Sequence, residues 1–212
     1  MTTTALSQAM APVFEHGYFA SLSQGDTAAL LDHWQRMCRT GIQSRFMRAM
    51  SAEALAAHAA SVFAGGGHVI GWFQAGVLRG VAELHPEPDG SGEAAFTVEP
   101  GFRKRGIGLG LMRRVLRRAR NLGLKRVRIE TTRDNRAMVR LALSVGAELT
   151  SDGREVLAVV PLSPATGASL AADVADGAAG TSAAIGLAGA VFWLDLAGAW
   201  AQFPVPAGRP CT

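Results

Sequence analysis

The sequence predicts a mixed α/β (α+β) fold whose sheet is mainly antiparallel. Two strand-like segments, residues 68–73 and 77–84, are joined by a short turn at residues 74–76, which is a hairpin signal. A third strand-like segment, residues 93–98, is followed by an amphipathic helix and then another strand. This order is typical of a βαβ-like unit attached to a meander, and it therefore favours a mixed sheet.

The chain before the meander predicts one strand and two helices. Residues 18–22 form the candidate strand. Asp26 is a candidate N-cap, and apolar residues follow it at helical spacing: Leu30, Leu31, Trp34 and Met37. Ser51 is the candidate N-cap of a second helix, which the run Gly65-Gly66-Gly67 ends.

The chain after the meander predicts two helices and two further strand regions. Residues 108–122 carry a single apolar stripe formed by Leu109, Met112, Val115, Leu116, Ala119 and Leu122. Residues 125–131 alternate like a strand, and residues 135–145 form the second candidate helix. Residues 148–150 and 155–160 predict a final hairpin around an Asp-Gly turn.

Length and composition indicate one domain with an appendage. The chain has 212 residues, of which 49% are hydrophobic and 18% charged, as in globular proteins. We assign residues 1–162 to an enzyme-like domain and residues 163–212 to an Ala/Gly-rich C-terminal extension. The first residues lack the basic and apolar regions of a signal peptide, and the two cysteines suggest no disulfide framework, so we expect a cytoplasmic protein.

The extension contains an apolar segment, residues 183–201, in which Asp195 is the single charged residue. Its length approaches the roughly 20 residues of a membrane-spanning helix. However, its glycines, its aspartate and the lack of flanking Lys or Arg argue against a membrane span. We expect the extension to dock on its own domain or on the second copy of a homodimer.

The segment from Val98 to Gly108 carries the strongest functional signal. It follows a strand, opens a helix, and contains Arg103-Lys104-Arg105-Gly106-Ile107-Gly108. Glycines let a backbone approach a ligand closely, and the N–H groups at a helix N-terminus suit a phosphate. The basic residues add positive charge in the same place. The segment therefore predicts a site for a pyrophosphate-containing ligand.

These motifs resemble the GNAT N-acetyltransferase superfamily over roughly residues 16–162. The family's phosphate-loop signature, Arg/Gln-x-x-Gly-x-Gly/Ala, matches Arg103, Gly106 and Gly108, and a preceding Val-x-Pro matches residues 98–100. The family's Asn at the start of the next helix matches Asn135, and its helix-ending Gly matches Gly146.

The resemblance implies acetyl-CoA as co-substrate, bound where the strands at 93–98 and 125–131 splay apart. The residues that it implies as coenzyme contacts are Phe96, Val98, Arg103, Lys104, Arg105, Gly106, Ile107, Gly108 and Asn135. One departure concerns the leaving thiolate. Many family members carry a Tyr seven residues after the Asn, and Ala142 stands there.

The residues on either side of the loop, from Glu93 to Val98 and from Asn135 to Ala142, resemble those of the bacterial protein-lysine acetyltransferases of the superfamily. In that branch a strand glutamate at the position of Glu93 is the general base, which removes a proton from the attacking ammonium. Glu93 can equally be an ordinary strand carboxylate. Glu83 and Glu130 are lesser candidates, and we expect Glu130 to pair with Arg128 or Arg126.

Other chemistries fit the sequence less well. Its five histidines and two cysteines lack metal-ligand spacing, so no metal is expected. The arginines of residues 108–122 are expected to be solvated, and the chain contains no known nucleic-acid module. Three functions remain open: acetylation of a primary amine on a protein lysine, acetylation of a small amine, and a non-catalytic module that binds acetyl-CoA.

Overall fold

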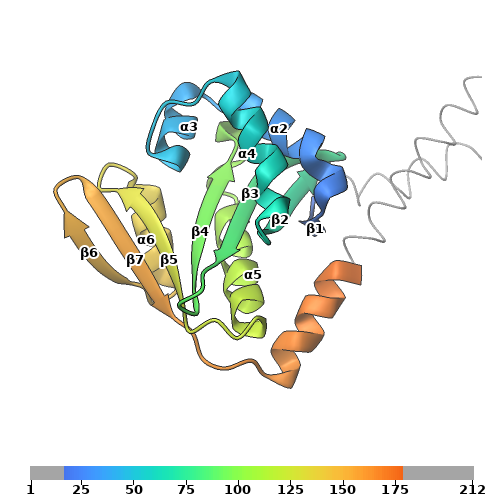
Figure 1. The fold of residues 1–212 in the computed structure, drawn as a ribbon, viewed down its shortest axis with the longest axis vertical. Coiled ribbons are helices and arrows are strands. Elements are labelled where there is room, and N and C mark those ends of the chain that lie inside the picture. The colour runs from blue at the N-terminus through green and yellow to red at the C-terminus, as the bar shows by residue number, and fades with distance from the viewer. Residues whose placement is uncertain (1–16, 179–212) are drawn as a thin grey trace, which may run out of the picture.

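A computed structural model describes residues 17–178, which are built around a seven-stranded sheet (Figure 1). The strands are β1 (Tyr18–Leu22), β2 (His68–Gln74), β3 (Val77–Pro86), β4 (Ser91–Val98), β5 (Arg126–Thr132), β6 (Glu148–Asp152) and β7 (Glu155–Pro161). They lie in the order β1-β2-β3-β4-β5-β7-β6. All neighbours are antiparallel except β4 and β5, which run parallel. The predicted mixed, mainly antiparallel sheet is confirmed.

The parallel strands β4 and β5 separate along their length. Their pairing runs only from Ser91 opposite Arg126 to Glu93 opposite Arg128. Beyond that rung, β4 continues to Val98 and β5 to Thr132 without pairing to one another. Within the described chain, the second half of β4 therefore has an unpaired main-chain edge toward β5. This opening is the splay that the resemblance implies.

Helices cover both faces of the sheet, because the strands carry apolar side chains on both. One face packs against α5 (Ile107–Asn121) and α6 (Arg136–Ser144), and the other against α2 (Thr27–Gln35), α3 (Arg39–Phe46) and α4 (Ala52–Ala64) (Figure 1). Leu111, Met112 and Val115 of α5 are fully buried in the first core. Leu30 and Trp34 of α2 are fully buried in the second.

The structure adds two α-helices to those predicted, one before the meander and one at residues 167–178. Residues 39–46 form α3, although they show almost no amphipathic pattern and bury only Ile42. Tertiary contacts decide this helix, because it lies over the splay and contacts both β4 and β5. β3 also extends to Pro86 and so includes two residues of the predicted loop.

The chain leaves β7 through residues 162–166 and forms a helix from residue 167 to the last described residue, 178. This helix lies against α5 (Figure 1). None of the helices within residues 17–178 is long and apolar enough to cross a membrane. The apolar segment at residues 183–201 lies outside the described residues.

Candidate active site

The phosphate loop begins where β4 ends. A single 3-10 turn, Pro100–Phe102, follows the strand, and α5 begins at Ile107. Between them, Lys104 has φ 60° and Gly106 has φ 79°. Alternation between left-handed and other conformations turns successive N–H groups toward one point, which forms an anion-binding concavity. Gly106 suits this position because it lacks a Cβ.

The main-chain N–H groups of the loop are available to a ligand. Within the described residues, none of the N–H groups of residues 104–109 donates a hydrogen bond. An α-helix leaves its first N–H groups without an intrahelical acceptor, and its N-terminus carries partial positive charge. The loop and the first turn of α5 thus present a set of unused donors beside the splay.

The three cations of the loop are exposed, and no acid within residues 17–178 pairs with them. Arg103 Nε donates to the Val98 carbonyl oxygen at 3.0 Å, which folds its side chain back across the end of β4. The Arg105 guanidinium lies over the Phe102 ring, 5.3 Å from its centre. Among the residues that the structure describes, Arg103, Lys104 and Arg105 form no ion pair with a carboxylate. Their charge remains available to a phosphate.

Asn135 stands at the other side of the splay and makes two structural contacts. Its Oδ1 accepts from the N–H of Met138 at 3.2 Å, so it caps α6. Its Nδ2 donates to Ser44 Oγ on α3 at 3.1 Å, which links the helix above the splay to α6. Ala142, on the same helix, is fully buried in the core beneath α5 and α6.

Glu93 lies at the floor of the splay. It is opposite His85 of β3 and opposite Arg128 of β5, at the last rung that joins β4 to β5. Alternate side chains of a strand share a face, and Thr97 on β4 contacts His33 of α2. Glu93 therefore points to the face that carries α2, α3 and α4. Within residues 17–178 its half-buried carboxylate makes no hydrogen bond or ion pair.

Glu83 lies on the same face but is engaged. Its carboxylate, 1% exposed, accepts from Arg45 at 2.8 Å and lies 3.1 Å from His58 Nε2 and 3.4 Å from His85 Nε2. Burial by itself raises the pKa of Glu83, but the Arg45 charge and the histidine hydrogen bonds outweigh it and hold that pKa below its usual range. A permanently ionised, enclosed carboxylate is a poor proton acceptor, which leaves Glu93 as the better candidate.

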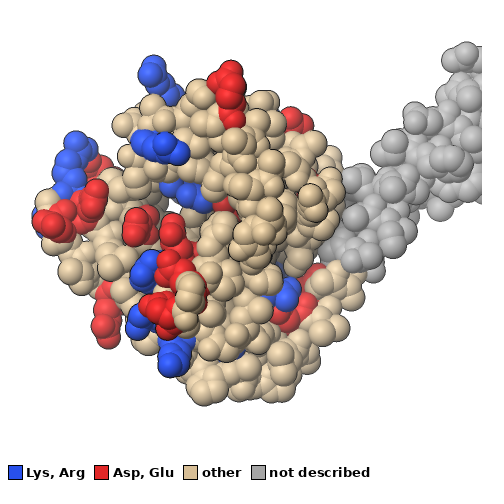
Figure 2. Space-filling model, viewed as in Figure 1, with Lys and Arg blue, Asp and Glu red and all other residues tan. Residues whose placement is uncertain are grey.

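The expected pairing of Glu130 with Arg126 or Arg128 is wrong. Arg126 instead pairs with Asp89 at 2.6 Å, and Arg128 pairs with Glu87 at 2.8 Å. The parallel register brings the loop before β4 alongside the start of β5, so its carboxylates reach the arginines. On the face of the molecule that Figure 2 shows, acidic and basic side chains gather beside a hollow between α3 and the strands β4 and β5.

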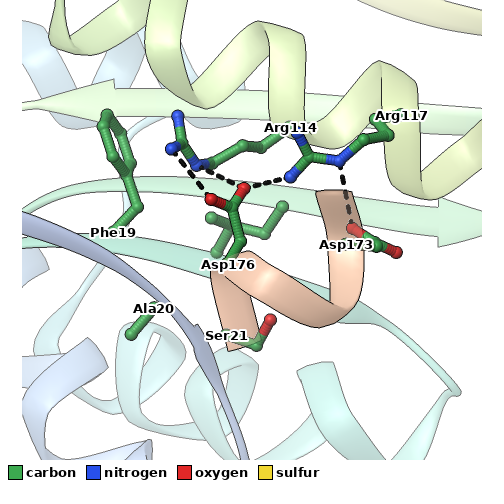
Figure 3. A pocket seen from close by; sticks show the side chains of 8 residues that line it. Phe19, Ala20, Ser21, Arg114, Arg117, Asp173 and Asp176 are labelled. Carbon is green, nitrogen blue, oxygen red and sulfur yellow. Dashed lines mark hydrogen bonds and ion pairs between the residues drawn. The ribbon is translucent and has the colours of Figure 1, made fainter. Parts of the chain in front are cut away.

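A small cavity elsewhere has a different character. It lies between β1, α5 and the helix at 167–178, and Figure 3 shows that its arginines and aspartates point toward each other. Since these charges neutralise one another, the cavity does not offer cations to a phosphate. No group of three or more potential metal ligands occurs within the described residues.

Comparisons with solved structures find the same fold in several other proteins. The S. lividans PAT GNAT domain is 16% identical with a TM-score of 0.61, covering 69% of this chain and 90% of that one. Salmonella typhimurium yncA, a putative acetyltransferase solved with acetyl-CoA, is 18% identical with a TM-score of 0.57, covering 69% and 94%. A Sinorhizobium meliloti phosphinothricin acetyltransferase, solved with acetyl-CoA, is 15% identical with a TM-score of 0.59, covering 71% and 90%.

At these identities the structural neighbours establish the fold alone. No curated protein matches the chain in sequence. The family model described as "Acetyltransferase (GNAT) family" matches residues 28–147, which is more than half of the chain. That span contains the splay, the phosphate loop and Asn135. The chain therefore belongs to the GNAT acetyltransferase family.

Proposed function

We propose that this protein transfers an acetyl group from acetyl-CoA to a primary amine. One observation carries the proposal: a loop of unused N–H donors and free cations lies at the end of a strand whose edge is open toward its neighbour. A pyrophosphate needs such donors and cations, and a pantetheine arm needs an open main-chain edge. The two lie in the sequence order that the family motif requires.

The coenzyme would lie with its pantetheine arm in the splay, against the main chain near Phe96 and Val98. Its pyrophosphate would meet the N–H groups of the loop, and the cations there would balance its charge. The contacts proposed in the loop are Arg103, Lys104, Arg105, Gly106, Ile107 and Gly108. Asn135 would act mainly by holding α6 and α3 beside the splay, since both ends of its amide are engaged.

Glu93 would act as the general base. An ammonium must lose a proton before its nitrogen can attack the thioester carbon, and the Glu93 carboxylate can take that proton directly or through water. The carbon–sulfur bond then breaks and the thiolate leaves. A free thiol has a pKa of about 8.5, so the thiolate needs no dedicated acid at the position of Ala142.

The acceptor class is a finer question. The combination of Glu93 and Ala142 resembles the protein-lysine branch, and the GNAT domain of S. lividans PAT has a similar fold. The phosphinothricin acetyltransferase of S. meliloti, whose name points to a small amine, has a comparable TM-score. We therefore propose a protein lysine as the acceptor and retain the small amine as the alternative.

Glu93→Gln tests the mechanism, because glutamine keeps the shape of the side chain but cannot take the proton. Activity should be measured as CoA release with a panel of lysine-containing proteins and a panel of small amines. We expect a rate loss of about 10²–10⁴ with the active panel. The loss should shrink as pH rises, since more amine is then neutral. Glu155→Gln, an exposed glutamate on β7, is the matched control.

The outcomes separate the candidate functions. Release with proteins alone supports lysine acetylation, and release with small amines alone supports the alternative. Coenzyme binding without turnover on either panel would support the non-catalytic module. Full activity of Glu93→Gln at neutral pH would remove Glu93 from the mechanism.

A further inference from the structure

Glu99, the residue that follows β4, is buried and holds two arginines. Its side chain is 8% exposed, and its two oxygens have separate partners. Oε1 accepts from Nε of Arg36, the residue that follows α2, at 2.9 Å, and Oε2 accepts from Arg79 Nη1 of β3 at 2.8 Å. Burial raises the pKa of Glu99, but the hydrogen bonds and charges of both arginines outweigh it and lower that pKa. Glu99 therefore remains ionised.

The same network holds the C-terminal end of β4 against α2. His33 is fully buried, with Nδ1 3.4 Å from Glu99 Oε1 and Nε2 2.8 Å from Thr97 Oγ1. Arg36 also donates through Nη2 to the Leu78 carbonyl oxygen at 2.7 Å. One carboxylate thus joins α2, β3 and the end of β4 at a single point.

Two backbone hydrogen bonds of Glu99 connect this network to β3 and to the turn before the phosphate loop. The N–H of Glu99 donates to the Arg79 carbonyl oxygen at 3.0 Å, and the Glu99 carbonyl oxygen accepts from the N–H of Phe102 at 2.9 Å. The Arg79 guanidinium lies 4.9 Å from the centre of the Phe102 ring, against which Arg105 also lies. Glu99 therefore contacts the turn from which the loop starts directly through its carbonyl oxygen, and indirectly through Arg79, which its carboxylate holds against Phe102.

We propose that Glu99 is a positioning residue that sets the phosphate loop for the coenzyme's pyrophosphate. This inference rests on the proposed coenzyme site. Placing a carboxylate beside an anion site is electrostatically unfavourable, and a buried ion pair is a weak source of stability. Its position is explained if it orients the loop, because an arrangement of N–H donors binds an anion well only when it is held in place in advance.

This proposal and simple charge counting predict opposite results. Glu99→Gln removes a negative charge near the loop, so charge alone would strengthen the binding of an anion. The positioning role predicts weaker binding, because an amide cannot accept from both arginines through two oxygens. We expect the dissociation constants of CoA and of 3′-phosphoadenosine 5′-diphosphate, its nucleotide half, to rise about tenfold, which corresponds to about 1.4 kcal/mol.

Calorimetric titration of the full chain, well below its unfolding temperature, measures this effect separately from stability. Asp173→Asn is the matched control, because it also removes a largely buried carboxylate that pairs with two arginines but lies away from the splay, and the affinity for both ligands should stay within about twofold. Should Glu99→Gln fail to fold, Arg79→Lys keeps the charge but loses the planar contact with Phe102 and should weaken binding several-fold.

Unchanged or tighter binding by folded Glu99→Gln would overturn the positioning role and leave the coenzyme site intact. Equal weakening in Asp173→Asn would also overturn it, since the effect would then be a general cost of losing a carboxylate that pairs with two arginines. A wild-type protein that binds neither ligand would overturn the coenzyme site itself, and the inference with it.

Discussion

Two groups of cations lie on either side of the start of α5 and differ in what faces them. The loop cluster, defined as Arg103, Lys104 and Arg105, precedes the helix and meets no carboxylate among the described residues. The helix cluster, defined as Arg114, Arg117 and Arg118, lies along α5. It faces Asp173 and Asp176 of the helix at residues 167–178 (Figure 3).

The contacts of the helix cluster are numerous. Arg114 Nε lies 2.9 Å from Asp176 Oδ2, and both Arg117 Nε and Arg118 Nε lie 3.3 Å from oxygens of Asp173. Arg117 also pairs with Asp176, and the Arg114 guanidinium lies 3.7 Å from the centre of the Phe19 ring. The expectation that these arginines are solvated is wrong. Two groups of basic residues that look alike in the sequence thus have different roles. The loop cluster is open to a ligand, and the helix cluster binds the helix at residues 167–178.

The two regions should differ most in their response to acid. In the network around Glu99, which precedes the loop cluster, burial and the nearby Arg36 charge outweigh the Glu99 charge and lower the pKa of His33 to about 4, whereas a free histidine has a pKa of about 6.5. The unfolded chain therefore binds more protons between these values, and stability falls as pH drops from about 6.5 to about 4, by on the order of 3 kcal/mol.

Urea unfolding of wild type and His33→Gln across this pH range measures the difference. The variant should lose this part of the pH dependence. An identical pH dependence in both proteins would show that His33 is not the titrating group. Near the helix cluster, burial and the Arg118 charge lower the pKa of His68 as well, so only the part of the pH dependence that His33→Gln removes belongs to the region of Glu99.

A negative charge introduced into the loop should affect coenzyme binding, whereas one on the middle of α5 should not. Gly108→Glu adds a carboxylate to the first turn of α5, and a Cβ there would make an ordinary 3.5 Å contact with Leu141. A glutamate in a first turn favours the helix, so folding should persist. We expect at least about a tenfold loss of acetyl-CoA affinity by calorimetry.

Arg113→Glu, at an exposed position on α5, is the matched control and should change the affinity by less than about twofold. Equal losses in both variants would mean that net charge, rather than the loop, governs binding. Unchanged affinity in folded Gly108→Glu would show that the assigned loop is incorrect.

Removing a carboxylate that pairs with the helix cluster should give the smallest effect. Asp176→Asn should lower the free energy of unfolding by about 1 kcal/mol at low salt, because the pairs are partly exposed. The difference should shrink in 0.5 M salt, because the Debye length falls to about 4 Å and the attraction within partly exposed pairs is then weakened. Glu148→Gln removes the same charge from an exposed strand position and should change stability little.

Acetyl-CoA affinity should stay unchanged in Asp176→Asn if the two regions act independently. A loss of affinity would instead mean that the helix at residues 167–178 supports the loop through α5. The same question bears on the domain boundary predicted at residue 162, which a truncation after Leu162 would test by its retention of coenzyme binding. We propose that the truncated chain still binds the coenzyme but exposes the arginines of α5.

Local patterns were enough to predict most elements. The stripe of α5 and the Asn cap of α6 depend on neighbours along the chain, and both elements formed where expected. α3 was missed because its eight residues bury only Ile42 and are held by the strands beneath them. The hydrogen bonds of Glu99 to two arginines were also missed, since Arg36 and Arg79 are far away from it in sequence.

The sequence by itself determined the family and most of the elements, and it predicted the phosphate loop, because glycine conformation, N–H geometry and helix periodicity are set over a few consecutive residues. Only the tertiary structure decided which charges are free. Arg126 and Arg128 pair with loop acids, Glu83 is enclosed by Arg45 and two histidines, and the helix cluster meets Asp173 and Asp176. An ion pair depends on distance in space, and sequence spacing does not report that distance when the partners belong to different elements.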